Sequence, residues 1–354
     1  MVKLTIIAAL AASACTKFED PDIVVDLRVI AMEATLPEQV IDVDLSNPPP
    51  ADQLLAQVLP TRVCALVADP SFERDLRWSM TLCPSASNDR CDDPSYVVGS
   101  SVISDPDGDP LNPMPEPQMC AEVPADSRLL NVVLATLNGD SLKGFQGLDY
   151  EVLLEVGGVD ADPSLDQYAF KTLQLAARVP SNRVANNNPY LDTSFSPGDT
   201  GSQGLVAILD GVTDFPLPLG RCVDDCPFPG DCHFPEFPRP STAFQVTPGE
   251  EVELTPNEPD GVHEQYFLPT TDGGAEMFTE SLTYEWIASG GKFSTGSTGG
   301  PRDLAGNPAP LATTWTAPSA QDVPNGAEIS LWIVQRDERY GVQWYESCFR
   351  VLPP

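Results

Sequence analysis

The sequence predicts an all-β protein built from two β-sandwich domains in tandem, with long proline-rich loops between the strands. Proline is unusually frequent, with 37 residues in a chain of 354, and it is disfavoured inside helices and central strands. Short runs rich in β-branched and aromatic residues recur along the chain and end at turn residues, as strands do. These patterns favour many short strands over helices.

The first half contains six expected strands, which fit one sandwich. Residues 22–33 are β-branched and alternate in part, and residues 61–68 alternate before the turn signal Asp69-Pro70. The next strand covers 76–82, and the stretch 89–117 is expected to be a loop. Three further runs complete the set, at 128–137, 150–156 and 168–179. We therefore assign an N-terminal domain to residues 22–180.

The second half repeats this organisation after a linker at 181–204, which has little apolar periodicity and contains Ser196-Pro197-Gly198. A short apolar run at 205–209 opens the C-terminal domain, assigned to 205–354. The segment 215–240 is rich in proline and cysteine, so we expect a disulfide-pinned loop without regular structure. The expected strands follow from Phe244 onward, at 251–254, 282–288, 311–315, 327–336 and 342–351.

The positions of two tryptophans indicate a particular class of sandwich. Trp78 and Trp286 each lie in a mid-domain strand, and immunoglobulin-like sandwiches bury a tryptophan on their third strand. Both are expected to be core residues, so the two domains are predicted to be immunoglobulin-like. Trp332 and Trp344 lie in late strands, and alternate burial leaves open whether one of them faces solvent.

The N-terminal residues predict export. Lys3 precedes a short apolar run at 4–12 and the small residues Ser13 and Ala14, the order found in a signal peptide. This run is far shorter than the about 20 residues that span a bilayer. Cys15 follows directly, and Ala12 to Cys15 resembles a bacterial lipobox, in which the cysteine is acylated. The resemblance predicts a signal peptide at 1–14 and a lipidated tether at 15–21.

Two interpretations of Cys15 stay open, a lipid anchor and an ordinary signal peptide cut nearby. The nine cysteines favour the anchor, because removing Cys15 leaves an even number for disulfides. Thr16, rather than aspartate, follows the cysteine, which favours an outer-membrane lipoprotein if the resemblance holds. The other eight are disulfide candidates, four in each half: Cys64, Cys83, Cys91, Cys120, Cys222, Cys226, Cys232 and Cys348. Cys83–Cys91 and a link within Cys222–Cys232 are expected, because each spans a short loop.

The charge restricts the partners. The formal net charge is −33, which repels phosphate backbones and excludes nucleic acid as a favoured partner. The acidic excess serves solubility, reflects a saline habitat or supplies calcium ligands. The expected partners are the membrane, through the lipid, and an unidentified envelope protein or glycan.

Metal sites have weak candidates. Asp105, Asp107 and Asp109 lie on one acidic loop and could offer oxygens to calcium. The glycine is at the fourth position of this loop, however, and not at the sixth as in an EF-hand. The alternative is an acidic turn exposed to solvent. Asp160, Asp162 and Asp166 form a weaker set. The spacing of Cys222, Cys226, Cys232 and His233 also suits zinc, but an oxidising compartment favours disulfides. No cofactor is expected beyond a possible calcium ion.

Catalytic motifs are scarce, so no enzyme is predicted. The chain has two histidines, His233 and His263, both expected to be loop side chains. Asp199-Thr200-Gly201 copies an aspartic-protease loop, but no strand precedes it and it has no second copy, as that chemistry requires. Phe228, Phe234 and Phe237 in the 215–240 loop are the candidate contact surface, the alternative being that they cap the core of the second domain.

Several short motifs, taken in order, resemble a family. They are the leading strand 26–31, Ala68-Asp69-Pro70, Asn186-Asn187-Asn188-Pro189, Pro248-Gly249, and a closing set of Trp315, Ala317-Pro318, Arg336-Asp337, Gly341 and Trp344. The chain is similar to uncharacterised lipoproteins of Gram-negative soil and predatory bacteria with tandem immunoglobulin-like or polycystic-kidney-disease-type domains. That resemblance implies a fold and a cell-envelope location, and no reaction.

The sequence thus predicts a lipid-anchored cell-envelope protein that acts as a non-enzymatic binding, spacer or assembly module. The alternative is a carbohydrate-binding or accessory protein of an extracellular enzyme system. Tryptophans exposed beside paired carboxylates would favour sugar binding, whereas buried tryptophans would favour the scaffold.

Overall fold

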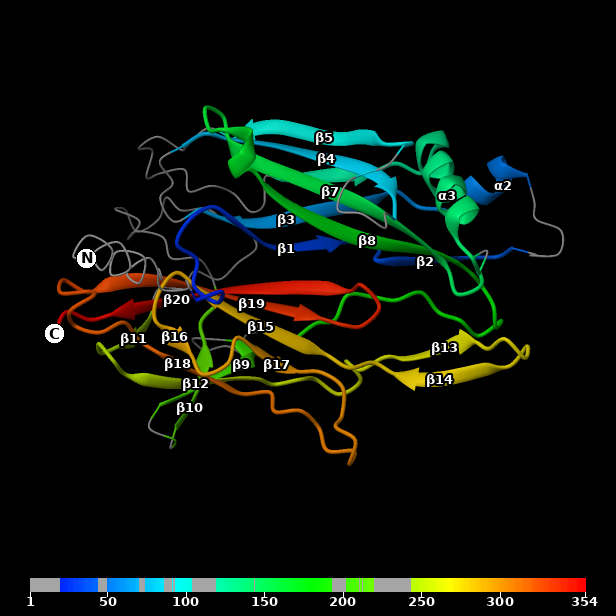
Figure 1. The fold of residues 1–354 in the computed structure, drawn as a ribbon. Coiled ribbons are helices and arrows are strands. Elements are labelled where there is room, and N and C mark those ends of the chain that lie inside the picture. Colours follow the sequence, from blue (N-terminus) through cyan, green and yellow to red (C-terminus); the bar gives the residue numbers. More distant parts are fainter. Residues whose placement is uncertain are drawn as a thin grey trace, which may run out of the picture.

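The computed structural model describes residues 20–43, 50–69, 74–85, 91, 93–103, 119–142, 144–192, 202–209, 211, 213–219 and 243–354. The predicted fold class is confirmed, because the protein is all-β and its large sheets form two sandwiches. Figure 1 shows the four large sheets stacked one over another, with the two inner sheets facing each other across the middle of the molecule.

The first sandwich is formed by two sheets. Its outer sheet contains β2 (Glu38–Ile41), β8 (Gln167–Ala177), β7 (Leu148–Gly158), β4 (Leu76–Pro84) and β5 (Tyr96–Ile103), in that order. Its inner sheet contains β1 (Arg28–Ala34), β3 (Thr61–Ala68) and β6 (Cys120–Val123). Within these sheets β2 pairs with β8 in parallel, and the other pairs are antiparallel.

The second sandwich is also formed by two sheets. Its inner sheet contains β11 (Phe244–Val246), β20 (Val342–Val351), β19 (Ala327–Arg336), β15 (Thr283–Ala288) and β17 (Ser297–Gly299). Its outer sheet contains β10 (Thr213–Leu217), β9 (Ser202–Leu209), β12 (Glu251–Pro256), β18 (Thr313–Thr316) and β16 (Lys292–Phe293). A separate hairpin, β13 (Gln265–Pro269) with β14 (Ala275–Thr279), projects from the end of this sandwich on the side where the first sandwich carries its helices (Figure 1).

Each sandwich has its own apolar core, filled by alternate residues of its strands as the period of two requires. Trp78, Met80 and Leu82 of β4 enter the first core. Trp286 of β15 and Trp315 of β18 enter the second, where both are almost fully buried. Trp78 and Trp286 are therefore core residues, as the sequence predicts.

A third apolar cluster joins the two sandwiches. The residues of β3 that alternate with its core positions, Cys64, Leu66 and Ala68, face the second sandwich. They belong to one cluster with Trp332 of β19 and Trp344 of β20, which are 8% and 9% exposed. The inner sheets are thus buried on both faces, so neither late tryptophan faces solvent.

The N-terminal end of the described chain also joins the sandwiches. Ile23 forms a parallel bridge with Ala288 of β15, with Val24 N–H donating to the Ala288 carbonyl at 2.8 Å. The predicted strand 22–33 is therefore wrong in its first part, because residues 22–24 pair with the second sandwich and the chain then crosses to the first sandwich, where β1 begins at Arg28.

The strand predicted at 128–137 is wrong, because it is the helix α3 (Ser127–Gly139). The carboxylate of Asp126 caps its N-terminus by accepting from the backbone N–H of Arg128 at 2.8 Å. Leu129, Val132 and Val133 follow helical spacing, are buried, and belong to the first core. Alternation and helical spacing overlap in a short apolar run, and here the cap and the space at the end of the sandwich favour the helix.

Two predicted loops also contain strands. β5 occupies part of 89–117, and β10 occupies residues 213–217, where the 215–240 loop was expected to begin without regular structure. Both lie at sheet edges, and proline is tolerated there. Two short helices complete the described elements, α2 (Ala51–Leu55) and a 3₁₀ turn (Pro163–Leu165).

Disulfides tie the first sandwich together. Cys64 of β3 is bonded to Cys120 of β6, and Cys83 is bonded to Cys91, the pair predicted from its short loop. Cys348 of β20 is disulfide-bonded as well. The predicted link within Cys222–Cys232 lies outside the described residues.

Candidate functional site

Many of the predicted site residues lie outside the part of the chain that the structure describes. These are Cys15, Asp105, Asp107, Asp109, Cys222, Cys226, Cys232, Phe228, His233, Phe234, Phe237 and the Asp199-Thr200-Gly201 motif. The described residues contain instead a polar cluster that the sequence did not predict, at one end of the contact between the sandwiches.

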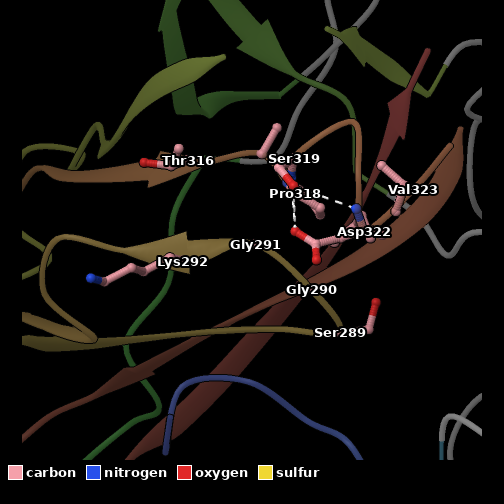
Figure 2. Close-up of a pocket in the computed structure, with 11 residues that line it drawn as sticks. Ser289, Gly290, Gly291, Lys292, Thr316, Pro318, Ser319, Asp322 and Val323 are labelled. Carbon is pink, nitrogen blue, oxygen red and sulfur yellow. Dashed lines mark hydrogen bonds between the residues drawn. The ribbon is translucent and has the colours of Figure 1, made fainter. Parts of the chain in front are cut away.

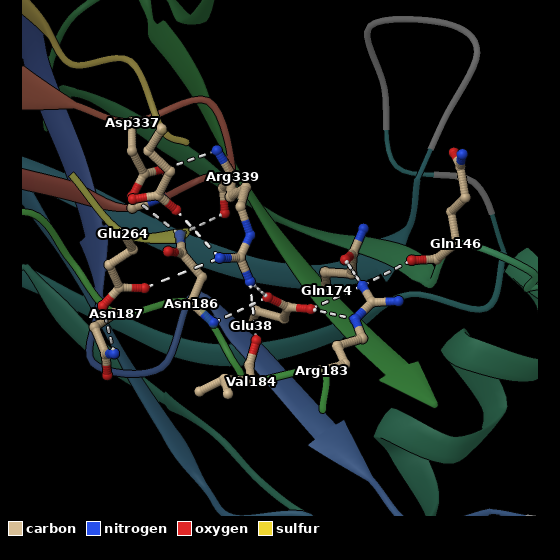
Figure 3. Close-up of polar contacts among 12 residues, drawn as sticks. Glu38, Gln146, Gln174, Arg183, Val184, Asn186, Asn187, Glu264, Asp337 and Arg339 are labelled. Carbon is tan, nitrogen blue, oxygen red and sulfur yellow. Dashed lines mark hydrogen bonds and ion pairs between the residues drawn. The ribbon is translucent and has the colours of Figure 1, made fainter. Parts of the chain in front are cut away.

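The centre of this cluster is a buried carboxylate, Glu38 of β2, which is 2% exposed (Figure 3). Arg183, itself 4% exposed, donates from Nη2 to Oε1 of Glu38 at 2.8 Å. The second oxygen accepts from the backbone N–H of Asn186 at 2.9 Å and from the guanidinium of Arg339. Two arginines and a backbone N–H therefore compensate one buried charge, which would otherwise cost several kcal/mol.

Arg183 makes further hydrogen bonds to the first sandwich from the same nitrogen. Its Nη2 donates to the backbone carbonyl of Gln146 at 2.8 Å and to Oε1 of Gln174 on β8 at 3.0 Å. Gln174 donates in turn to Asp149 of β7 at 2.8 Å. Arg183 is thus bonded to β2, to the loop at Gln146 and to β8 of the first sandwich.

Arg339 belongs to the turn between β19 and β20 and connects the cluster to the second sandwich. Its Nη1 lies 3.2 Å from Oε1 of Glu280 and 3.9 Å from Oε2 of Glu264. Its guanidinium carbon lies 4.6 Å from the ring centroid of Tyr266 in β13, a cation–π geometry. One guanidinium thus contacts both sandwiches and the β13–β14 hairpin.

Burial perturbs a carboxyl in this cluster. Burial, followed by the negative charge of Asp337, raises the pKa of Glu280 to about 7, although Arg339 opposes the change. This carboxyl therefore titrates near neutral pH, well above its ordinary range.

Motifs that the sequence analysis singled out separately meet here. Asn186 donates from Nδ2 to Asp337 Oδ2 at 3.0 Å, and Asn188 accepts from the Val342 N–H at 3.1 Å while donating to the Ala34 carbonyl at 2.7 Å. The segment predicted as a linker is therefore packed between the sandwiches over its described part. Its asparagines bond backbone groups of both.

Other predicted polar sites have structural roles. Asp166 accepts from Arg77 through both oxygens at 2.8 Å, and Asp162 caps the 3₁₀ turn at Ser164, so this weaker calcium set is not supported. Among the described residues, no three or more His, Cys, Asp or Glu side chains are grouped to hold a metal.

His263 lies in a loop, as predicted, and is hydrogen-bonded on both ring nitrogens. Nδ1 lies 2.9 Å from the Glu280 carbonyl and Nε2 lies 3.0 Å from Glu258. Burial lowers the pKa of His263, but the bonds to Glu258 and to the Glu280 carbonyl outweigh it and leave the pKa raised. These bonds fix the ring beside the hairpin.

A shallow cavity of about 480 Å³ lies between the turn before β16 and the segment after β18 (Figure 2). Its lining is mostly small or apolar, and Ser319 donates to Asp322 at 2.7 Å within it. Lys292 extends away from Asp322 in Figure 2. The cavity therefore lacks the converging polar groups that mark a ligand site.

Comparisons with known proteins give no family. No family model matches the chain, and neither does any curated protein. Solved structures similar to it include dimeric latent PorU from Porphyromonas gingivalis, with 8% identity, 93% of this chain covered, 24% of that chain covered and a TM-score of 0.15. The native conformation of Escherichia coli alpha-2-macroglobulin shares 8% identity, with 90% of this chain and 16% of that chain covered and a TM-score of 0.18.

A third similar structure is SGBP-B of the Bacteroides ovatus mixed-linkage glucan utilization locus, in complex with a heptasaccharide. It shares 11% identity, with 93% of this chain and 71% of that chain covered and a TM-score of 0.17. The chain spans less than a quarter of the length of the first two structures. At these identities and TM-scores, the likenesses carry no argument about function.

The described residues contain no helix that is long and apolar enough to cross a membrane.

Proposed function

We propose that this chain is a non-enzymatic, lipid-anchored module of the bacterial cell envelope, in which two fused sandwiches act as a rigid spacer. The observation that carries the proposal is the double connection between the sandwiches. An apolar cluster contains both late tryptophans, and a buried polar cluster surrounds Glu38. Separate domains on a flexible linker need neither, and their relative motion is the default expectation when an interface is small.

The position of the polar cluster supports this function. It lies where the first sandwich, the segment 183–188 and the β19–β20 turn meet, so it opposes hinge motion at the connection. Its charged side chains are occupied by one another, as expected for a structural connection. The lipid attachment at Cys15 is supported by the order of charged, apolar and small residues before it.

Rigidity is tested by small-angle scattering on the soluble Cys15→Ser form. A compact chain of this length has a radius of gyration of about 20 Å, and two sandwiches on a flexible linker give a larger value with a flexible scattering profile. The spacer proposal requires the compact value, and the extended one would contradict it.

The anchor is tested separately by metabolic palmitate labelling and membrane fractionation. We expect label and membrane retention in the wild type and neither in Cys15→Ser. Replacing both Cys83 and Cys91 by serine is the matched control, since it removes two disulfide-bonded cysteines without touching the N-terminal segment. Equal labelling of the wild type and Cys15→Ser would remove the anchor.

Carbohydrate binding remains a second candidate, and one observation favours it. The hairpin β13–β14 presents a stacked aromatic pair, Tyr266 and Phe278, with ring centroids 5.5 Å apart, and Phe278 is 36% exposed. Exposed rings are one way to bind sugar faces, whereas the buried Trp332 and Trp344 are not available for this. Affinity electrophoresis in mixed-linkage glucan, comparing Phe278→Ala with Val97→Ala on a distant edge strand, tests it. Retardation lost only in Phe278→Ala would support this candidate, and equal mobility with and without glucan would oppose it.

A further inference from the structure

A second cavity, of about 490 Å³, lies between the two sandwiches and shares Asp337 of the β19–β20 turn with the Glu38 cluster. One wall is formed by residues 29–32 of β1 and 169–172 of β8, and another by residues 336–338 and 340–342 around the β19–β20 turn. Cavities of roughly 300–1,000 Å³ at domain interfaces are typical small-ligand sites. The cavity has an apolar side, which includes Val29, Ile30 and Phe170, and a polar side formed by the turn.

Lys171 is the notable residue of this cavity. It is 4% exposed, and lysine is rarely buried this deeply without a paired charge. Its ammonium has three donors, and one of them is used by the backbone carbonyl of Tyr340. No ion pair connects Lys171 to a carboxylate of the described residues. Two N–H donors of the buried Lys171 ammonium are therefore left for an acceptor on a molecule bound in the cavity.

The surrounding charges leave this cation incompletely compensated. Burial, and next the positive charge of Arg336, lowers the pKa of Lys171 to about 8, while Asp337 and Glu33 offset part of that effect. Asp337 is already engaged, because Oδ1 accepts from the N–H groups of Arg339 and Gly341 at 2.7 Å. The ammonium is therefore mostly charged at pH 7 and lacks a dedicated counter-ion.

Arg336 adds a second unmet donor on the same cavity. Its Nη2 lies 3.2 Å from Glu285 of β15, but its Nε is buried and has no hydrogen-bond partner. Such an orphaned buried donor is uncommon in a folded protein. Two cationic side chains with spare donors thus border one cavity in a strongly acidic chain.

We propose that this cavity between the sandwiches binds a small molecule that carries a carboxylate on an apolar body, with Lys171 as its charged partner. The carboxylate offers two oxygens, each able to accept from more than one donor, which fits the free donors of Lys171. The apolar body packs on the β1 and β8 wall. This binding goes beyond the spacer function, which needs no ligand.

The test uses benzoate as the probe and benzamide as its uncharged match, titrated by calorimetry into the soluble Cys15→Ser chain. We expect benzoate to bind with a Kd of about 1 mM and benzamide at least about tenfold more weakly, the usual effect of losing one charge-assisted hydrogen bond. Lys171→Met should weaken benzoate binding by a similar factor. Lys292→Met, the same change at an exposed lysine, should leave it unchanged.

Three results would overturn the proposal: no saturable benzoate binding, equal binding of benzamide, or equal benzoate binding by Lys171→Met. Inorganic phosphate binding as tightly as benzoate would overturn the assignment of an apolar body. If Lys171→Met does not fold, trace acetylation of the wild type decides. Benzoate, and not benzamide, must then protect the Lys171 amine, and equal acetylation with both probes would refute the site.

Discussion

Removing the indole of Trp332 should show how much the contact between the sandwiches contributes to the free energy of unfolding, apart from the two cores. This side chain is 8% exposed and belongs to the apolar cluster shared by both sandwiches. A buried aromatic side chain of this kind covers about 150–250 Å², which at about 25 cal/mol per Å² corresponds to roughly 4–6 kcal/mol. Measured Trp→Ala changes in cores cost about 3–5 kcal/mol. We therefore expect Trp332→Ala to lower the free energy of unfolding by about 4 kcal/mol.

The matched control is Leu331→Ala, one residue earlier on β19. Leu331 is 1% exposed and points into the second core, so its truncation also destabilises, by about 2–5 kcal/mol. Urea unfolding measures both changes, and small-angle scattering measures the radius of gyration before unfolding. We expect the radius to increase in Trp332→Ala and to stay constant in Leu331→Ala. A loss below about 1 kcal/mol in Trp332→Ala, or the same expansion in both variants, would refute this account of the contact.

Three further predictions concern charge and crosslinks. Burial raises the pKa of Glu280 to about 7, so the protonated carboxyl stabilises the fold below about pH 4.5 and this contribution is lost as the pH rises through 7. Glu280→Gln should therefore raise the free energy of unfolding by about 2 kcal/mol over the wild type at pH 8 and change it very little at pH 4, as measured by urea unfolding. Arg183→Met leaves Glu38 with less compensation and should cost about 3–5 kcal/mol by the same measurement, and a cost below about 1 kcal/mol would show that the pair is not needed. Replacing Cys64 and Cys120 by alanine removes a crosslink between residues 56 apart and should cost about 4 kcal/mol, so an unchanged urea midpoint would contradict this role.

The strands were largely predictable because strand formation leaves a local signal. The expected strands at 61–68, 327–336 and 342–351 match β3, β19 and β20. The run at 128–137 was not predictable as a helix from alternation alone, since its helical spacing and its cap at Asp126 had to be weighed together. The hairpin β13–β14 was missed because residues 257–280 carry many polar residues and turn signals.

The sequence contains a signal for the contact between the sandwiches, in the apolar runs of two strands. Within these strands, residues 63–68 and 331–334 are continuous apolar runs, and such runs are typical of strands buried on both faces. They were interpreted as strands with one buried face. Continuous apolar strands in both halves of the chain indicate stacked sheets, and this would have placed Trp332 and Trp344 inside the molecule.

The Glu38 cluster could not be predicted, because its members are far apart in the chain. Glu38 and Arg339 are separated by 301 positions, and neither has a neighbour in sequence that marks it as buried. Asn186, Asn188 and Asp337 stood out only as members of short motifs. Their mutual contact depends on how the two sandwiches are placed, which local residue patterns do not encode.

By itself the sequence determined that this chain forms strands, where many of them lie, and that Trp78 and Trp286 fill the two cores, because alternation and proline act over a few residues. Only the tertiary structure decided that the second face of each inner sheet is buried against the other, which side chains compensate Glu38, and that Lys171 borders a cavity. The physical reason is that burial and charge compensation depend on the surroundings that a fold creates. Those surroundings come from segments that are distant in the chain.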